Sequence, residues 1–161
     1  MSAVIPRSFW LDEALARENL SATPLRADTH CDVCIVGGGY TGLWTALRLK
    51  EAEPALDVLV IERDLCGAGA SGRNGGFLST WWSKFLSLEK ICGGSEALRL
   101  ARAAEQSFKD IQTFCAAEGI DCALRADGWL WTATNTQQVG AWASTMEALA
   151  RHGQTPIEAW P

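Results

Sequence analysis

Residues 31–42 read Cys31-Asp32-Val33-Cys34-Ile35-Val36-Gly37-Gly38-Gly39-Tyr40-Thr41-Gly42, an apolar run that passes directly into a glycine-rich turn. The valines and isoleucine of this run favour strands and suit a buried parallel strand. Gly37, Gly39 and Gly42 have G-x-G-x-x-G spacing. In such a turn the first glycine allows the tight turn, the second lets a pyrophosphate approach the backbone, and the third lets the next helix pack closely. The stretch therefore predicts a strand followed by a phosphate-binding turn.

The residues that follow complete the expected strand–helix–strand unit. Residues 41–52 are good helix formers with apolar side chains at helical spacing, so the free N–H groups of the helix start would face the phosphates. A second apolar run at 58–61 predicts the next strand. Glu62 follows it, 20 residues after Gly42, where a carboxylate can accept hydrogen bonds from both hydroxyls of an adenosine ribose. The whole arrangement predicts an α/β, Rossmann-like βαβ domain that binds a dinucleotide.

The first motif alone does not decide which dinucleotide is bound. An acid at position 62 argues against a 2′-phosphate, and hence against NADP. Arg63 is a reservation, because a guanidinium could pair with that phosphate. Nicotinamide and flavin dinucleotides both stay open at this point.

The next segment, residues 65–77, contains five glycines and almost no large apolar residue, so we expect no packed element there. A flexible surface linker is one interpretation, but linkers are more often rich in serine, proline or charge. This segment instead leads into Phe77-Leu78 and the pair Trp81-Trp82. Successive small residues expose backbone amides that form anion-binding concavities. The segment is therefore predicted to wrap a diphosphate and reach the edge of a flavin.

Residues 36–43 and 69–76 together resemble the FAD-dependent amine and amino-acid oxidoreductases of the D-amino-acid oxidase superfamily. The resemblance is nearest to the γ-glutamylputrescine oxidoreductase-like branch, and it continues more weakly through Asp127-Gly128-Trp129. It implies an FAD cofactor and oxidation of an amine or amino-acid-like substrate by hydride transfer to the flavin. It also implies that this chain corresponds to the N-terminal part of a longer one, whose C-terminal part returns to complete the cofactor domain.

The resemblance also assigns roles to residues. It places Gly37, Gly39 and Gly42 at the pyrophosphate and Glu62 at the ribose, with the second segment along the diphosphate and flavin. Positions 65–78 contain no histidine that could tether the cofactor, so non-covalent FAD is expected. Groups that select the amine are expected mainly beyond residue 161, so no catalytic residue is named. The full predicted cofactor-binding set is Gly37, Gly39, Tyr40, Thr41, Gly42, Glu62, Arg63, Ala70, Ser71, Arg73, Asn74, Gly75 and Gly76.

Composition places the chain in the globular class. It has 161 residues, 48% apolar and 20% charged, and a net charge of −5 with no basic stripe, which disfavours nucleic acid as a partner. No run approaches the ~18 apolar residues of a membrane span, and the N-terminus does not read as a signal peptide, so we predict a cytoplasmic protein. The oligomeric state is not predicted.

The cysteines and histidines predict no metal site. Six cysteines in such a chain are expected to be reduced thiols, and the C-x-x-C pair Cys31 and Cys34 is interpreted as structural because no second pair with ligand spacing follows. The other four are scattered. His30 and His152 stand far apart and are expected to face solvent or cap helices.

The remaining sequence predicts ordinary elements in three parts: an N-terminal arm (1–28), the N-terminal part of the FAD-binding domain (29–120), and the start of a mixed α+β substrate domain that is expected to be truncated (121–161). The arm carries a short helix at 12–20. Amphipathic periodicity predicts a long helix at 95–117 and a second helical pattern from 139 to 149. Runs 121–126 and 129–134 flank Asp127-Gly128 and predict a β-hairpin, with a further strand at 155–160. Trp81, Trp82 and Phe85 are expected to pack against the neighbours of the flavin domain, the alternative being a membrane-facing or partner-facing patch.

Three functional hypotheses follow. The leading one is an FAD-dependent amine oxidoreductase, or its N-terminal part. A second is a truncated, non-catalytic fragment that only binds FAD or ADP. A third is an NAD-dependent dehydrogenase, which fits the first motif but leaves the segment at 67–76 unexplained.

Overall fold

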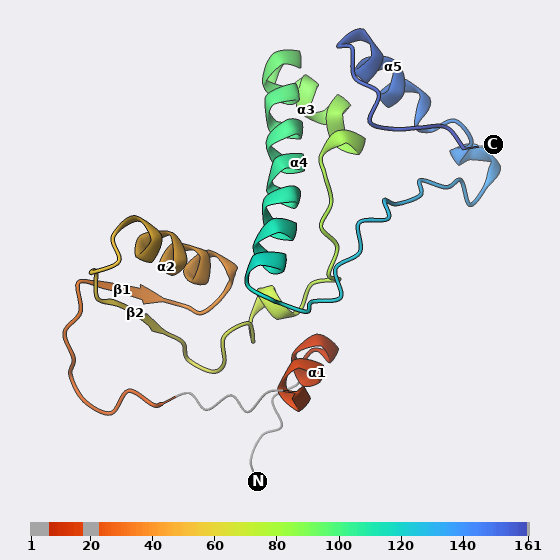
Figure 1. Cartoon of the computed structure of the whole chain (residues 1–161). Coiled ribbons are helices and arrows are strands. Elements are labelled where there is room, and N and C mark those ends of the chain that lie inside the picture. The colour runs from red at the N-terminus through yellow and green to blue at the C-terminus, as the bar shows by residue number, and fades with distance from the viewer. Residues whose placement is uncertain (1–6, 18–22, 161) are drawn as a thin grey trace. The chain divides into compact units, whose positions relative to one another are not determined.

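The structure, a computed structural model, describes residues 7–17 and 23–160. It divides into two compact units, residues 1–77 and 78–161 (Figure 1). The first unit holds the predicted strand–helix–strand motif, and the second is helical. Among the described residues, no helix is both long enough and apolar enough to cross a bilayer.

The first unit is built on two parallel strands joined by a helix. Strand β1 (Val33–Val36) is followed by helix α2 (Tyr40–Ala52) and strand β2 (Val58–Ile61), and the register pairs Val33 with Val58 through Val36 with Ile61. The predicted α/β unit is therefore confirmed. Helix α1 (Phe9–Arg17), drawn in red in Figure 1, precedes it. The expected arm helix thus begins three residues earlier than predicted, and the end predicted for it at residue 20 lies outside the described residues.

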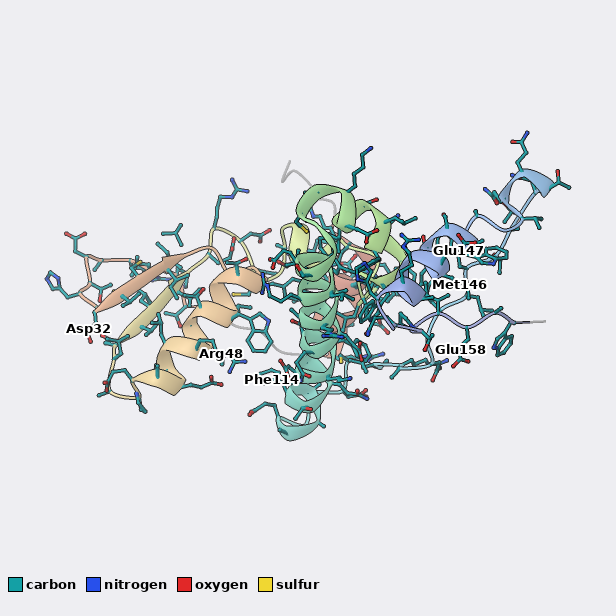
Figure 2. All side chains as sticks on the ribbon, turned by 90° about the horizontal axis from the view of Figure 1, so that it is seen from above. Asp32, Arg48, Phe114, Met146, Glu147 and Glu158 are labelled. Carbon is teal, nitrogen blue, oxygen red and sulfur yellow. The ribbon has the colours of Figure 1, made fainter. Side chains whose placement is uncertain are left out.

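Hydrogen bonds at the start of both strands fix this register. The Asp32 carboxylate, labelled in Figure 2, accepts from the backbone N–H of Asp57 at 2.9 Å. The N–H of Val33 donates to the carbonyl of Asp57 at 3.1 Å. Burial in the motif itself is low, because α2 has no buried residue and Val36 is 82% exposed. Backbone pairing and close backbone approach, more than a buried core, define the motif.

The second unit has the apolar core. It contains a 3-10 turn, η2 (Trp82–Lys84), then α3 (Phe85–Cys92), α4 (Gly94–Ala117), a 3-10 turn η3 (Thr136–Gln138) and α5 (Ala143–Arg151). Helix α3 packs against α4 and α5. The buried cluster consists of Trp82, Phe85, Leu88, Ala97, Ala101, Ala148 and Leu149. Since Trp82 and Phe85 are buried and Trp81 is half exposed, the packed interpretation of this aromatic group holds for two of its three rings.

Two polar pairs stabilise the packing of these helices. The indole N–H of Trp82 donates to Glu105 at 3.0 Å. A hydrogen bond from Lys109, and secondly this bond from Trp82, lower the pKa of the Glu105 carboxyl. His152 Nε2 lies 2.7 Å from Glu89 Oε1, and the His152 ring packs edge-on against Phe85. His152 stands at the C-cap position of α5, but its side chain neither faces solvent freely nor caps the helix, because it binds Glu89 and packs on Phe85. Its bond to α3 was not expected.

The structure contradicts several expected elements in the second unit. Residues 120–133 form no strand, so the predicted hairpin around Asp127-Gly128 is wrong, and residues 154–160 are irregular as well. An isolated two-stranded hairpin is marginal without a third strand or a packed helix, and Trp129 and Leu130 are largely exposed. The long helix is confirmed within one residue, whereas the second begins at Ala143, after η3, and not near residue 139.

One pair of cysteines also departs from expectation. Cys115, in the last turn of α4, and Cys122 were expected to be unrelated, yet their sulfurs lie 3.7 Å apart. Desolvation and the neighbouring Cys122 raise the pKa of the Cys115 thiol. A positive-φ glycine, Gly119, turns the chain back toward the helix end and makes this approach possible.

Candidate nucleotide-binding site

The glycine turn between β1 and α2 has the geometry that its sequence predicts. Gly37 has a φ of 108°, a conformation that other residues rarely adopt, and its N–H donates to the carbonyl of Ile61 at 2.8 Å. A Cβ at Gly42 would lie 2.0 Å from the carbonyl oxygen of Gly37 and 3.2 Å from Ile35 Cγ2. Gly37 therefore makes the turn, and Gly42 lets α2 approach the strand.

The start of α2 offers backbone donors. Gly39 is the N-cap residue and supplies no side-chain cap. The first N–H groups of a helix have no partner within it. Here the N–H of Tyr40 donates to Ser71 Oγ at 2.9 Å. Among the described residues, the N–H groups of Thr41 and Gly42 have no protein acceptor. The positive end of the α2 dipole and these donors form an arrangement that binds anions.

Glu62 lies beside the turn, directly after β2. Its Oε2 accepts from the N–H of Gly38 at 2.7 Å and its Oε1 accepts from the N–H of Asp64 at 3.1 Å. These two backbone donors, with a smaller contribution from Arg63, hold the pKa of the Glu62 carboxyl below its usual value. Glu62 is exposed and ionised at neutral pH, and each carboxylate oxygen has a further lone pair for a hydroxyl donor.

The second glycine-rich segment folds onto the first. The N–H of Gly67 donates to the carbonyl of Gly38 at 2.9 Å, and Ser71 Oγ reaches the start of α2. Residues Ala70–Gly72 form a short 3-10 turn, η1, which has no buried residue and therefore agrees with the expectation of no packed element. This turn closes because Gly72 lies against the carbonyl of Gly67, where a Cβ could not fit. The two motifs, 30 residues apart in sequence, thus form one surface at the end of β1 and β2.

The remaining predicted residues lie on or beside this surface with less defined roles. Arg73 Nε donates to the carbonyl of Ala68 at 2.9 Å, and Asn74 Nδ2 donates to the carbonyl of Ser71 at 2.7 Å. The N–H of Gly76, whose φ is 73°, donates to Asn74 Oδ1 at 2.8 Å. These bonds shape the segment locally. The other predicted residues at the surface are exposed: Tyr40, Thr41, Arg63, Ala70 and Gly75.

The structure adds residues that the sequence interpretation omitted. Gly38 is buried, and a Cβ there would collide with Cys66, so the central glycine is as constrained as its neighbours. The position of Gly38 inside the glycine run could have identified it from the sequence. The helix α1 also contributes, because Ser8 Oγ donates to the carbonyl of Gly72 and Trp10 Nε1 donates to that of Asn74 at 3.0 Å. No local pattern marks these two residues.

The donor set fits the adenosine diphosphate half of a dinucleotide. Free N–H groups at a helix start suit a diphosphate, and the turn lacks side chains where the phosphates would approach. The carboxylate at the end of β2 suits ribose hydroxyls. The chemistry of these groups is therefore compatible with FAD, and all of the groups belong to the first unit.

Comparison with known proteins also points to an FAD-dependent family. The FAD dependent oxidoreductase family, DAO, matches residues 32–160. The chain is 40% identical to the γ-glutamylputrescine oxidoreductase of Escherichia coli (strain K12) over 135 residues, which cover 83% of this chain and 31% of that protein. It is also 40% identical to the probable oxidoreductase OrdL of Rhizobium meliloti (strain 1021) over 123 residues, 74% of this chain and 28% of that protein.

The chain therefore spans only about a third of the length of each of these two relatives, 31% and 28%. No solved structure matches the chain significantly. The family match covers far more than half of the 161 residues and includes both glycine-rich segments, Glu62 and all the helices of the second unit. On these grounds, the chain belongs to the DAO family of FAD-dependent oxidoreductases.

Proposed function

We propose that this chain binds FAD non-covalently and forms the dinucleotide-holding part of an oxidoreductase that acts on an amine or amino-acid-like substrate. One observation carries the proposal: the two glycine-rich segments converge on the start of α2, through the bonds Gly67 N–H to Gly38 carbonyl and Tyr40 N–H to Ser71 Oγ. An accidental glycine turn would not have a second glycine-rich segment folded against it.

Each group in this surface has a separate role in the proposal. The N–H groups at the start of α2 bind the diphosphate, assisted by the helix dipole. The Ser71 hydroxyl, which now accepts from Tyr40, has a proton to donate to a phosphate oxygen. Glu62 accepts from the adenosine ribose while its backbone bonds to Gly38 and Asp64 keep the carboxylate oriented. Non-covalent binding is proposed because positions 65–78 contain no histidine.

The substrate class follows from the relatives and stays part of the proposal. One relative is named for γ-glutamylputrescine, so we propose an amine-bearing substrate for a protein that contains this chain. When bound, FAD supplies a two-electron acceptor for the carbon next to the amine. The division into an arm (1–28), a cofactor part (29–120) and the beginning of a substrate domain (121–161) is proposed likewise, as is a cytoplasmic location.

A titration with FAD tests the proposal. Purified chain is mixed with FAD, and binding is followed by flavin fluorescence and absorbance, with ADP as competitor. Glu62→Gln keeps the size of the side chain and removes its charge, so we expect about tenfold weaker binding of both FAD and ADP. Glu147→Gln, on the exposed side of α5 (Figure 2), is the matched control and should bind as the wild type does.

Other outcomes separate the alternative functions. Binding of NADH without binding of FAD would favour a dehydrogenase. Bound FAD that no candidate amine reduces under anaerobic conditions would favour a cofactor-binding fragment without turnover. A chain that binds neither FAD nor ADP would refute the proposed function altogether.

A further inference from the structure

Helix α1 contacts the second glycine-rich segment through its first turn. Ser8 Oγ accepts from the N–H of Leu11 at 3.2 Å and donates its own proton to the carbonyl of Gly72. The Ser8 hydroxyl therefore caps α1 and binds the segment at the same time. Trp10 Nε1, a group that can only donate, binds the carbonyl of Asn74 at 3.0 Å. Both bonds join residues 64 positions apart in the sequence.

The segment at 66–76 needs such contacts from outside. Its own bonds, such as Arg73 Nε to the carbonyl of Ala68 and Asn74 Nδ2 to the carbonyl of Ser71, span five residues or fewer. Local bonds shape a segment but do not fix where it lies. Because the segment consists largely of glycines and other small residues, it can adopt many other conformations when it is not bonded to the rest of the chain. Its position is fixed by the bonds of Gly67 and Ser71 to the glycine turn, and by the bonds that the start of α1 makes to the carbonyls of Gly72 and Asn74.

We propose that α1 is a latch that holds residues 70–74 in the conformation that binds FAD, with Ser8 and Trp10 as positioning residues. The proposal rests on the proposed function, and it adds a role for a helix outside the residues of the family match, which begin at 32. The backbone carbonyls that α1 binds belong to Gly72 and Asn74, in the same segment that supplies Ser71 to the start of α2. Opening the latch lowers the fraction of chains whose segment is ready for the cofactor, and apparent affinity falls by that fraction.

The variant Trp10→Phe tests the latch with little other change. It keeps an aromatic ring that can still pack edge-on against Phe9, and it removes only the indole ring system's N–H donor and extra bulk. Because Trp10 is half exposed, we expect the Kd for FAD to rise about two- to fivefold, and about tenfold when Ser8→Ala is added. Trp160→Phe, an exposed tryptophan of the other unit, makes the same chemical change and should leave the Kd unchanged.

A second measurement tests the latch without any flavin. Arg73 is exposed within the latched segment and is a site for trypsin, so its cleavage rate reports the open population of the segment. Cleavage at Arg73 should rise about two- to fivefold in Trp10→Phe and stay at the wild-type rate in Trp160→Phe. Far-UV circular dichroism of all variants confirms that they are folded.

The outcomes separate the latch from the proposed function. Wild-type chain that binds FAD, with Trp10→Phe and the double variant matching Trp160→Phe in both measurements, overturns the latch and leaves the proposed function in place. Wild-type chain that binds no FAD overturns the proposed function, and the latch then has no cofactor to serve. Weaker FAD binding together with faster cleavage at Arg73 supports the latch.

Discussion

Replacement of Gly42 by alanine is the sharpest test of the glycine turn. The added Cβ would lie 2.0 Å from the carbonyl oxygen of Gly37 and 3.2 Å from Ile35 Cγ2. Real side chains essentially never approach within 3.0 Å in this way, so the backbone of the turn or the axis of α2 must move. The first atom met belongs to backbone, which cannot rotate aside as a flexible side chain would.

The expected cost combines two opposing terms. Overpacking a close backbone contact costs about 3 kcal/mol, the upper part of the usual range, because the neighbour is rigid. Alanine in place of glycine within a helix stabilises the folded chain by up to about 1 kcal/mol. The net loss of about 2 kcal/mol in the free energy of unfolding corresponds to a fall in Tm of about 4–8 °C for a chain of this size.

Thermal unfolding followed by far-UV circular dichroism measures this fall. Gly69→Ala is the matched control, because a Cβ at Gly69 meets no atom within 4 Å and its φ of −79° suits any residue. We expect a change within about 1–2 °C for that variant. If Gly42→Ala melts at or above the wild-type temperature, helix propensity outweighs the contact and the close approach of α2 to the turn is refuted.

Three further predictions concern charge, packing and oxidation. Folding lowers the pKa of Glu62, so the ionised carboxylate stabilises the folded chain above the unfolded pKa, and this stabilisation is lost as pH falls through the folded pKa. The Tm of Glu62→Gln should therefore lie below that of the wild type at pH 6–7. The difference between the two Tm values should disappear in acid. Trp82→Phe should lose about 1–3 kcal/mol of stability in urea titration, since it removes the bond to Glu105 and buried volume, whereas exposed Trp81→Phe should lose little. Peptide mapping after mild hydrogen peroxide treatment should find a disulfide between Cys115 and Cys122. It should form faster at higher pH, because the thiolate is the reactive form and the raised pKa of Cys115 moves thiolate formation to higher pH. Absence of that disulfide would contradict the observed approach of the two sulfurs.

The strand–helix–strand unit could be predicted closely because each of its signals is local. The apolar runs gave β1 and β2 their bounds, and the spacing of Gly37, Gly39 and Gly42 gave the turn. The spacing of 20 residues between Gly42 and Glu62 predicted the position of the acid. Glu62 does lie beside the turn, where it accepts from the N–H of Gly38. That the site residues bind FAD stays a prediction.

The hairpin around Asp127-Gly128 could not be judged in the same way. Its alternation of apolar residues and its turn dipeptide are correct local signals, but strand formation depends on packing and pairing partners that a local pattern does not contain. The same limit applies to Ser8 and Trp10, whose acceptors lie 64 residues away. It applies also to Cys115 and Cys122, whose approach depends on the turn after α4.

The low burial of the strand–helix–strand unit makes the stability of this chain sensitive to a ligand that binds the unit. No residue of β1, α2 or β2 is buried, so these elements gain little of the apolar stabilisation that the helical unit obtains from Phe85 and Leu149. A ligand that binds only the folded form adds about 2.7 kcal/mol when present at 100 times its Kd. If FAD binds as proposed, it stabilises the folded form of this unit, so the Tm of the chain should depend on the concentration of free FAD.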